Sequence, residues 1–217
     1  HGSQAPAYGS IVASGANACV LHYVENDRCM QDGDLLLIDA GCELDGYASD
    51  ITRSFPVSGR FSGPQKAVYE LVLAAQAAAI AEIRPGASWN AGHDAATRVL
   101  TQGFIDLGLI KGSLDDAIES GNYRQFYMHR TGHWLGLDVH DAGEYKLAGE
   151  WRPLAAGNVL TVKPGAYIRP ADGVPEAFWN IGIRIEDDAL VTDTGCDIIT
   201  IATPKSVADI EAVMAER

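Results

Sequence analysis

The spacing of apolar and polar residues divides the chain into regions typical of strands and regions typical of helices. From residue 8 to residue 56 the apolar runs are short, and Ser-Gly and Asp-Gly pairs separate them. Such runs between turn residues predict strands, which we place at residues 11–12, 19–23, 35–40 and 51–55. From residue 65 to residue 83 apolar side chains recur every three or four positions. This spacing predicts a helix that is capped by Ser62 and ends before Pro85.

The remainder of the chain contains further elements of both kinds. A second helix is predicted over residues 88–108, a second strand-rich region over residues 126–201, and a short amphipathic helix over residues 204–215. Strands are thus followed by two helices and then by strands again, which is the order of an α+β fold. We expect one domain over residues 1–217, made of two half-units: strands 8–56, and helices 65–108 with strands 126–201.

The two strand-rich regions resemble each other. Residues 33–41 and 157–165 each contain a turn glycine, a mostly apolar strand and then a polar residue six positions after the glycine, Asp39 or Lys163. Further along, Asp50 corresponds to Glu186 on another short strand. Chance similarity of two glycine-bounded strands is the alternative, but the shared interval favours an internal duplication. A two-fold arrangement would bring these four positions together at its axis.

The duplication also predicts a missing segment. The second half-unit has a helix pair before its strands, whereas the strands of the first begin within ten residues of the N-terminus. We therefore expect a helix pair of roughly 50 residues upstream in the parent chain. The chain opens with His1 rather than Met, so we interpret it as processed or as a piece of a longer protein.

Composition and charge exclude several classes of function. Apolar residues make up 47% of the chain, and 16 basic residues against 29 acidic ones give a net charge of −13. An acidic surface repels nucleic acid and anionic membranes, so we expect neither as a partner. No apolar run approaches the roughly 20 residues of a membrane span, and no signal peptide is visible. The four cysteines have no CxxC spacing, so we expect small buried thiols and a reducing, cytoplasmic location.

Four polar residues in strand-rich regions are candidates for metal binding. Asp39 follows a run of four apolar residues, and Asp50 and Glu186 have similar settings. His133 lies in a stretch where three histidines follow one another at intervals of four and seven residues. An ionised carboxylate in such a strand must be paired or bound to a cation. Two Asp, one Glu and one His suit a divalent ion such as Mn²⁺, or two metals that share bridging carboxylates. For any one residue alone, turn capping or an ion pair with a nearby arginine is the better explanation, but the four together favour a metal.

These residues lie in motifs that resemble a known family. The motifs are residues 19–23 (CVLHY), 37–41 (LIDAG), 50–53 (DITR), 129–141 (HRTGHWLGLDVHD) and 182–188 (GIRIEDD). In order, and over essentially the whole chain, they resemble bacterial aminopeptidase P, the Xaa-Pro aminopeptidase among the pita-bread metallopeptidases. The resemblance implies a strongly curved antiparallel sheet with helices on its outside and a pseudo-two-fold duplication. It also implies a further N-terminal domain before the missing helix pair.

The resemblance implies a metal centre and a catalytic role for each matching position. Asp39, Asp50, His133 and Glu186 would be ligands of a dinuclear Mn²⁺ centre, with Asp50 and Glu186 bridging. A metal-bound water would be the nucleophile. His140 would contact the scissile peptide group and stabilise the tetrahedral intermediate, and the catalytic set would consist of His140, His129 and Glu186.

The resemblance also implies a pocket for a peptide whose second residue is proline. The residues that would line it are His22, His129, His140, Arg184 and Tyr167. For His22 and His129, a partly buried histidine that makes ordinary hydrogen bonds is the alternative. The full-length protein would be a homo-oligomer.

Lys163 departs from the pattern of this family. The family has a fifth metal ligand, a Glu in a Val-Glu-Pro-Gly turn, where this chain has Val-Lys-Pro-Gly. A protonated ammonium has no lone pair to donate, and it would repel a nearby divalent cation while pairing with carboxylates. We therefore expect one bound metal or none and low activity, with the ion shared by His133 affected more than the ion bound by Asp39. An engineered change, a natural loss of catalysis and a natural one-metal variant all remain as explanations.

Two other functions compete with Xaa-Pro aminopeptidase activity. Prolidase has nearly the same ligands but accepts only dipeptides, so it would release proline from Xaa-Pro and leave longer peptides intact. A non-catalytic peptide-binding protein would keep the pocket without the metals. Peptide binding without turnover at saturating Mn²⁺ would favour this second alternative.

Overall fold

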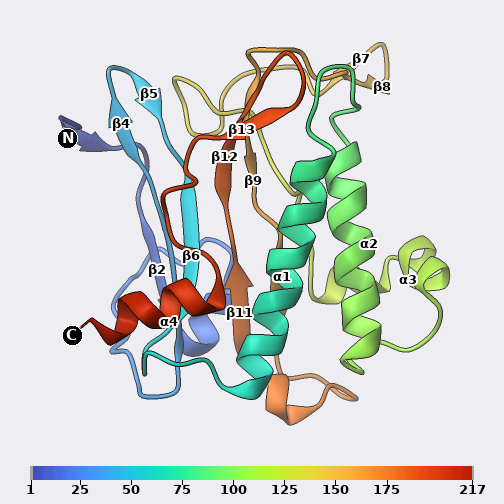
Figure 1. Cartoon of the computed structure of the whole chain (residues 1–217). Coiled ribbons are helices and arrows are strands. Elements are labelled where there is room, and N and C mark those ends of the chain that lie inside the picture. The colour runs from blue at the N-terminus through green and yellow to red at the C-terminus, as the bar shows by residue number, and fades with distance from the viewer. Residues whose placement is uncertain (1, 217) are drawn as a thin grey trace.

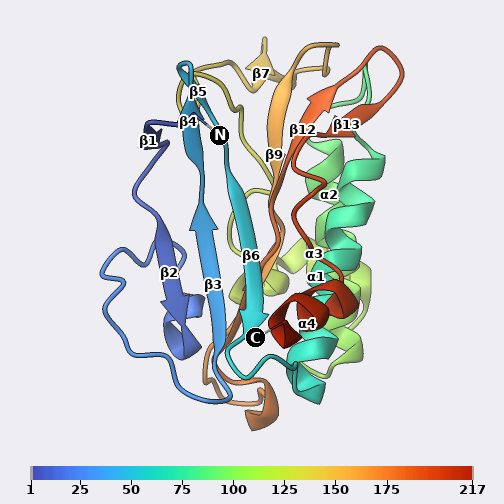
Figure 2. The ribbon, with the colours of Figure 1, turned by 60° about the vertical axis from the view of Figure 1, so that its left-hand side comes forward.

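The computed structural model describes residues 2–216, and within them the strands form a layer that the helices cover on one side. Figure 1 shows α1 (Gly63–Ala81) and α2 (Ala91–Asp106) side by side in front of the strands, and α4 (Val207–Ala215) near the C-terminus. Figure 2, turned by 60°, shows the strands on one side and the helices on the other. The strands pair antiparallel throughout this part of the chain. The predicted α+β class is confirmed.

The N-terminal strands form two small sheets. The larger contains β2 (Ile11–Ser14), β3 (Leu35–Ala40) and β6 (Ile51–Pro56), with β3 in the centre. The other contains β1 (Ala5–Pro6), β4 (Cys42–Leu44) and β5 (Tyr47–Ala48). The register of the larger sheet pairs Asp39 with Thr52, so both face the same neighbourhood. The strands predicted at 11–12, 35–40 and 51–55 are confirmed to within two residues.

The strand predicted over residues 19–23 is wrong. Gly15–Cys19 form a 3-10 helix, η1, and no strand covers the described stretch from 20 to 34. A Cβ atom on Gly182 would lie 2.3 Å from the carbonyl group of Ala18, so η1 packs directly on the backbone of the strand that contains Gly182. Cys19 is 2% exposed because of this packing. Cys19 is therefore buried although it belongs to no strand.

The helices agree with their predicted positions. They are α1 (Gly63–Ala81), α2 (Ala91–Asp106), α3 (Leu114–Ser120) and α4 (Val207–Ala215). Ser62 caps α1 in a capping box, since its hydroxyl accepts from the Gln65 amide while the Gln65 side chain accepts from the Ser62 amide. Of the four, α3 was not predicted, because its seven residues are too few to show a helical period.

The C-terminal strands form a second set of small sheets. They are the hairpin β7 (Lys146–Leu147) and β8 (Glu150–Trp151), the sheet of β9 (Val159–Val162), β12 (Asp187–Val191) and β13 (Cys196–Ile198), and the pair β10 (Gly165–Ile168) and β11 (Ile181–Arg184). Two further 3-10 turns, η2 (Asn122–Gln125) and η3 (Glu176–Phe178), connect these elements. Apolar side chains of α1 pack against β9, β10 and β11 and form the main core.

The two sets of strands meet where the duplicated acidic residues lie. The amide of Glu186 donates to the carbonyl of Thr52 over 3.0 Å, and the amide of Asp50 donates to Oδ2 of Asp188 over 3.1 Å. The segments of Asp50 and Glu186 thus lie side by side, in agreement with the expectation that the duplicated positions come together. The backbone amides of the candidate ligands Asp50 and Glu186 are therefore held by hydrogen bonds to segments more than 130 residues away in sequence.

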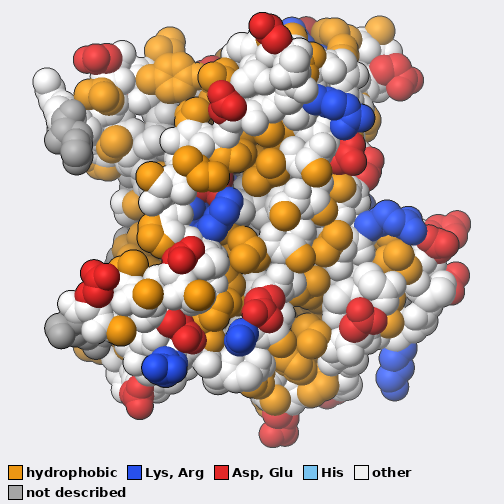
Figure 3. All heavy atoms as spheres, viewed as in Figure 1, with side chains coloured by type: hydrophobic (Ala, Val, Ile, Leu, Met, Phe, Trp, Pro, Cys, Tyr) orange, Lys and Arg blue, Asp and Glu red, His pale blue; other side chains and the backbone are white. Residues whose placement is uncertain are grey.

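The structure tests two expectations that were drawn from composition, the buried cysteines and the acidic surface. All four cysteines are free, but only Cys19 is buried, whereas Cys29 and Cys42 are exposed, so the prediction of buried thiols is wrong for these two. On the face in Figure 3, acidic, basic and apolar side chains are interspersed and form no continuous acidic patch. No helix within residues 2–216 combines the length and apolar character that a membrane span requires.

Candidate active site

A cleft of about 640 Å³ opens beside the junction of the two sets of strands. Its volume lies within the range of about 300–1,000 Å³ that is usual for ligand pockets. Four histidines line it, and so do four cationic side chains and a group of aromatic rings. Asp39 is the acidic residue among the described lining residues. The lining residues are Leu21, His22, Asp39, Trp89, His129, Arg130, Gly132, His133, His140, Tyr145, Lys146, Trp151, Lys163 and Arg184.

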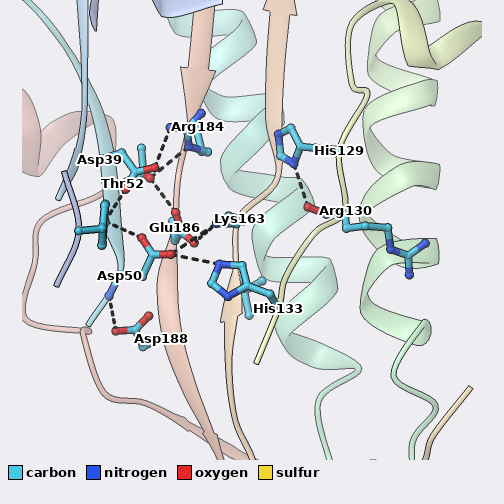
Figure 4. A network of polar contacts seen from close by, with 12 residues as sticks. Asp39, Asp50, Thr52, His129, Arg130, His133, Lys163, Arg184, Glu186 and Asp188 are labelled. Carbon is cyan, nitrogen blue, oxygen red and sulfur yellow. Dashed lines mark hydrogen bonds and ion pairs between the residues drawn. The ribbon is translucent and has the colours of Figure 1, made fainter. Parts of the chain in front are cut away.

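Three carboxylates converge beside this cleft, and one of them, Asp39, lines it (Figure 4). Asp39 lies on β3, Asp50 immediately precedes β6, and Glu186 lies between β11 and β12. All three are buried, with 6%, 2% and 0% exposure. The hydroxyl of Tyr8 lies 2.5 Å from Oδ1 of Asp39 and 2.7 Å from Oδ1 of Asp50. A hydroxyl has a single proton, so Tyr8 can donate to only one of these carboxylates at a time.

The Lys163 ammonium lies among these carboxylates. Its Nζ atom is 3.1 Å from Oε1 of Glu186 and 3.4 Å from Oδ2 of Asp50, and its side chain is 16% exposed. Burial alone would lower the pKa of Lys163, but the charges of Glu186, Asp50 and Asp39 outweigh it and raise this pKa above its ordinary value. Lys163 therefore carries a full positive charge at neutral pH.

The pKa values of Asp50 and Glu186 shift in opposite directions. For Asp50, burial acts to raise the pKa, but the contact with His133 and the charge of Lys163 outweigh it and hold the pKa below its ordinary value. Burial raises the pKa of Glu186 well above its ordinary value, and repulsion from Asp50 and Asp39 adds to this against the attraction of Lys163. The two cations Lys163 and Arg184 thus balance two carboxylates, while burial disfavours ionisation of the third.

A second cation, Arg184, connects Asp39 to the cleft wall. Its Nη2 atom donates to Oδ2 of Asp39 over 2.8 Å, and its Nε atom donates to the Thr52 hydroxyl over 3.2 Å. That hydroxyl in turn donates to Oε2 of Glu186 over 2.7 Å. Thr52 therefore orients Glu186 while Arg184 orients Asp39, and both contacts are buried.

His129 makes hydrogen bonds through both ring nitrogens. Its Nδ1 atom lies 2.8 Å from the carbonyl oxygen of Arg130, to which it donates, and its Nε2 atom lies 2.8 Å from the Tyr167 hydroxyl. The Tyr167 hydroxyl also accepts from Nη1 of Arg184 over 3.1 Å. Burial lowers the pKa of His129 to about 3, so the ring is neutral at neutral pH. The structure thus places His129 in the cleft wall with its nitrogens already occupied.

His133 presents a nitrogen to the carboxylates. Its Nδ1 atom donates to the carbonyl of Trp134 over 2.9 Å, and its Nε2 atom lies 3.2 Å from Oδ2 of Asp50. The segment is held against β9, because the Thr161 amide donates to the carbonyl of His133 over 3.0 Å. A Cβ atom on Gly132 would lie 2.0 Å from the carbonyl oxygen of Thr161. Only a glycine permits this approach, which sets the position of His133.

Two further histidines line the open part of the cleft. The ring of His140 lies edge-on to that of His133, with 4.2 Å between ring centroids. Burial lowers the pKa of His140 below its ordinary value. His22 lines the same cleft from the irregular segment after η1 and is exposed. Both side chains are therefore accessible to a bound molecule.

The donor atoms fit one divalent cation. One ligand atom from each of Asp50, His133 and Glu186 lies within 4.8 Å of the others. Nε2 of His133 and Oε1 of Glu186 are buried and make no geometrically defined hydrogen bond among the described residues, although Asp50 and Lys163 lie within ion-pair distance of them. Buried donor atoms of this kind can serve as metal ligands. Asp39 lies outside this group, since Arg184 and Tyr8 contact its two oxygens. The Lys163 ammonium contacts two of the same three residues, so it competes for the position of the cation.

Three residues of the site were not identified from the sequence. Tyr8, Thr52 and Asp188 each contact a predicted ligand, and Asp188 has an Oδ1 atom without a hydrogen-bond partner in the described chain. Burial raises the pKa of Asp188 to about 7. Thr52 lies in the 50–53 motif and Asp188 in the 182–188 motif, each two residues after a predicted ligand. This shared offset could have identified both as residues of the site. Tyr8 carried no comparable signal.

Comparison with known proteins decides the family. Residues 1–193 match the model of metallopeptidase family M24. The chain belongs to the M24 metallopeptidases. Membership of M24 implies that a divalent metal binds in this family, which agrees with the group of Asp50, His133 and Glu186.

Individual M24 relatives are similar over almost the whole chain. The Xaa-Pro aminopeptidase of Haemophilus influenzae is 56% identical over 214 residues, which are 99% of this chain and 50% of that protein. The Escherichia coli Xaa-Pro aminopeptidase is 48% identical over 99% of this chain and 48% of its own length. The chain therefore spans about half the length of the curated relatives it matches.

Solved structures confirm the predicted fold. Aminopeptidase PepP of Pseudomonas aeruginosa superposes with a TM-score of 0.97 and 58% identity, over 99% of this chain and 49% of that one. A variant of Escherichia coli aminopeptidase P in complex with substrate superposes with a TM-score of 0.95 and 47% identity, over 99% and 49% of the two chains. The pita-bread fold of aminopeptidase P and the resemblance to that enzyme are thus confirmed.

Proposed function

We propose that this chain is the catalytic domain of a protein that binds peptides with proline in second position and hydrolyses the N-terminal Xaa-Pro bond. The observation that carries this proposal is the cleft in which four histidines open onto the buried Asp50, His133 and Glu186 group. The Xaa-Pro aminopeptidases to which the chain is similar support the substrate class. Because the chain spans half of those proteins, the activity, the location in the cytoplasm and the homo-oligomer of the full-length protein stay predictions.

The residues of this chain divide the work of binding and catalysis. Asp50, His133 and Glu186 would hold the metal ion, for which we propose Mn²⁺ because most of the donor atoms are oxygens. A bound ion of this kind supplies an activated water and polarises the scissile carbonyl. His140 lies beside His133 and faces the open cleft, so it is placed to donate to the peptide group at the cleaved bond.

The remaining residues of the predicted site position the others or contact substrate. His22 is accessible and would contact the first residues of the peptide. His129 and Tyr167 bond to each other and to Arg184, so their effect is to fix the cleft wall and the orientation of Asp39. Asp39 would take part in metal binding only after its contact with Arg184 or Tyr8 changes.

Lys163 is expected to weaken metal binding and activity. Its ammonium is bound to Asp50 and Glu186, which the ion also needs, and two like charges at this distance repel by several kcal/mol even at an effective dielectric near 20. We infer that the chain holds one Mn²⁺ at most, and that its peptidase activity is low. The same ion pairs favour the non-catalytic peptide-binding protein as the second candidate function.

Hydrolysis and binding of three matched peptides test the proposal. We expect slow release of alanine from Ala-Pro-Ala with added Mn²⁺, and no hydrolysis of Ala-Ala-Ala. Hydrolysis of Ala-Pro alone would favour prolidase instead. Saturable binding of Ala-Pro-Ala without turnover would favour the peptide-binding protein, and the absence of both binding and turnover would contradict both candidate functions.

Counting metals tests the inference about Lys163. Mass spectrometry under native conditions, after dialysis against Mn²⁺, should find no more than one ion per chain. Two tightly bound Mn²⁺ ions would contradict the competition between Lys163 and the cation. The Lys163→Glu variant should bind more Mn²⁺ and hydrolyse Ala-Pro-Ala faster than the parent chain. If it does not, the residues outside this chain become the explanation for weak activity.

A further inference from the structure

The cleft has a second charged region that the proposed mechanism does not use. Arg130, Lys146 and Trp151 line it together, along with the aromatic rings of Trp89 and Tyr145. Figure 4 shows the Arg130 side chain extending away from the carboxylate cluster, beyond His129 and His133. We call Arg130, Lys146 and Trp151 the cationic rim. The same cleft therefore has buried carboxylates near one end and the cationic rim at the other.

Both cations of the rim lie against one aromatic ring. The guanidinium carbon of Arg130 is 4.8 Å from the ring centroid of Trp151, and Nζ of Lys146 is 4.4 Å from it. Lys146 and Trp151 are register partners on β7 and β8, which places their side chains on the same side of the hairpin. Cation–π contacts of this length hold both charges at defined positions.

The two charges have no carboxylate partner among the described residues. Of the four cationic residues that line the cleft, Lys163 pairs with Asp50 and Glu186, and Arg184 pairs with Asp39. No ion pair within residues 2–216 contains Arg130 or Lys146.

The rim retains unused hydrogen-bond donors as well as charge. The guanidinium of Arg130 donates one hydrogen bond, to Oδ1 of Asn90, and has five N–H groups in total. Two like charges on one ring repel each other, and a bound anion relieves this repulsion. In a chain of net charge −13, a pair of unpaired cations at a cleft wall favours an anion strongly over the surrounding surface.

We propose that the cationic rim binds a carboxylate of the peptide on the C-terminal side of the cleaved bond. This inference rests on the proposed function, because it takes the peptide to run from the metal-binding end of the cleft toward the rim. The guanidinium offers two N–H donors to a carboxylate, and the ammonium adds charge. The aromatic rings of Trp89 and Tyr145 offer an apolar surface to the peptide residue that lies between the cleaved bond and the bound carboxylate. The rim thus selects short peptides with a free C-terminus, or peptides with an acidic side chain at that position.

Peptides that cannot be cleaved separate these two sources of a carboxylate. In each, a methylene group replaces the scissile carbonyl. The first arm compares Ala-Pro-Ala and Ala-Pro-Ala-Ala as free acids and as C-terminal amides. The second arm compares Ala-Pro-Ala-Glu-amide with Ala-Pro-Ala-Gln-amide. Affinities for the whole chain are measured by titration calorimetry at low and high salt.

We expect a carboxylate to improve affinity about tenfold or more in one arm at low salt, and less at high salt. The double variant Arg130→Gln, Lys146→Gln should lose this preference while it binds the amides with unchanged affinity, which shows that the cleft is intact. The matched control is Arg60→Gln, Lys111→Gln, because both residues are exposed and neither lines the cleft. The control should keep the full preference.

Two results would overturn the inference about the rim. One is equal affinity for acid and amide, and for Glu and Gln, in the parent chain. The other is a preference for carboxylates that survives in the rim variant. Failure of the proposed function is distinct from both, because none of the peptides would then bind. If the double variant does not fold, Lys146→Gln alone, on an exposed two-residue strand, should reduce the preference.

Discussion

The Nζ atom of Lys163 lies 3.1 Å from Oε1 of Glu186, which belongs to the buried group of Asp50, His133 and Glu186 that could hold a metal ion. The ammonium ion also contacts Asp50, so one side chain of the protein joins the two halves of the site. An internal cation of this kind stabilises the buried carboxylates in the absence of a metal. Removal of one partner from a buried ion pair costs about 3–5 kcal/mol, because the remaining charge is left uncompensated.

The first prediction concerns replacement of this ammonium. The Lys163→Met variant should be destabilised by about 3 kcal/mol without metal, because Asp50 and Glu186 lose their cation. Mn²⁺ should restore its stability, since Asp50, His133 and Glu186 then hold the ion without competition. The measurement is the free energy of unfolding in urea with EDTA and with Mn²⁺.

Lys205→Met is the matched control for this prediction. It also removes a buried ion pair, because Nζ of Lys205 lies 2.7 Å from Oδ2 of Asp187, but it frees no group of metal ligands. We expect it to be destabilised with no recovery in Mn²⁺. Equal responses of the two variants to Mn²⁺ would contradict the competition between Lys163 and the metal.

A second prediction concerns the ion pairs behind Glu186. The Asp187 carboxylate accepts from Nη2 of Arg53 over 2.7 Å and from Nζ of Lys205 over 2.7 Å, and its side chain is 0% exposed. Asp187→Asn should lower the free energy of unfolding by about 3 kcal/mol, because the buried Arg53 and the half-buried Lys205 lose their charged partner. Glu70→Gln, which removes an exposed ion pair with Lys66, should cost less than about 0.5 kcal/mol. Similar losses in the two variants would count against this account.

A third prediction concerns the dependence of stability on pH. Burial lowers the pKa of His129 to about 3 in the folded chain, whereas an unfolded histidine titrates near its ordinary value of about 6.5. The unfolded chain therefore binds more protons between these values. Stability from this residue is complete above pH 6.5 and is lost as the pH falls toward 3.

The His129→Gln variant should show a shallower loss of stability between pH 6.5 and pH 4, measured by urea unfolding at several pH values. His93, whose pKa burial lowers to about 4, should account for part of the slope that remains. Gln125→Ala, at an exposed position without an ionisable group, should leave the slope as it is in the parent chain. An unchanged slope in His129→Gln would show that His129 is protonated in the folded protein.

A fourth prediction concerns the close approach of Gly132 to β9. Gly132→Ala should destabilise the chain by about 3 kcal/mol or more and weaken peptide binding, because its Cβ atom would lie 2.0 Å from the Thr161 carbonyl oxygen and would displace His133. Gly63→Ala is the control, since a Cβ atom at the first residue of α1 meets nothing within 4 Å. That substitution should be neutral or slightly stabilising. Thermal unfolding of both variants is the measurement.

The helices and most strands could be predicted because their signals are local. The capping box at Ser62 and the apolar positions of α1 lie within a few residues of each other, so the sequence alone contains them. The segment 19–23 shows where this reasoning fails. Cys19 is buried where η1 packs on β11, which is distant in sequence, whereas Val20 is exposed. The apolar residues of this segment therefore do not share one buried face, and the sequence alone does not reveal this.

The sequence by itself determined which residue types meet at the site. The duplicated spacing marked Asp39, Asp50, Lys163 and Glu186. The sequence also shows directly that position 163 carries a cationic side chain where a carboxylate was expected. The tertiary structure decided how these charges are shared. Lys163 bridges Asp50 and Glu186, Arg184 engages Asp39, and both nitrogens of His129 are already bonded. These pairings depend on distances of a few ångströms between segments far apart in the chain, and Coulomb and hydrogen-bond energies change steeply over that range.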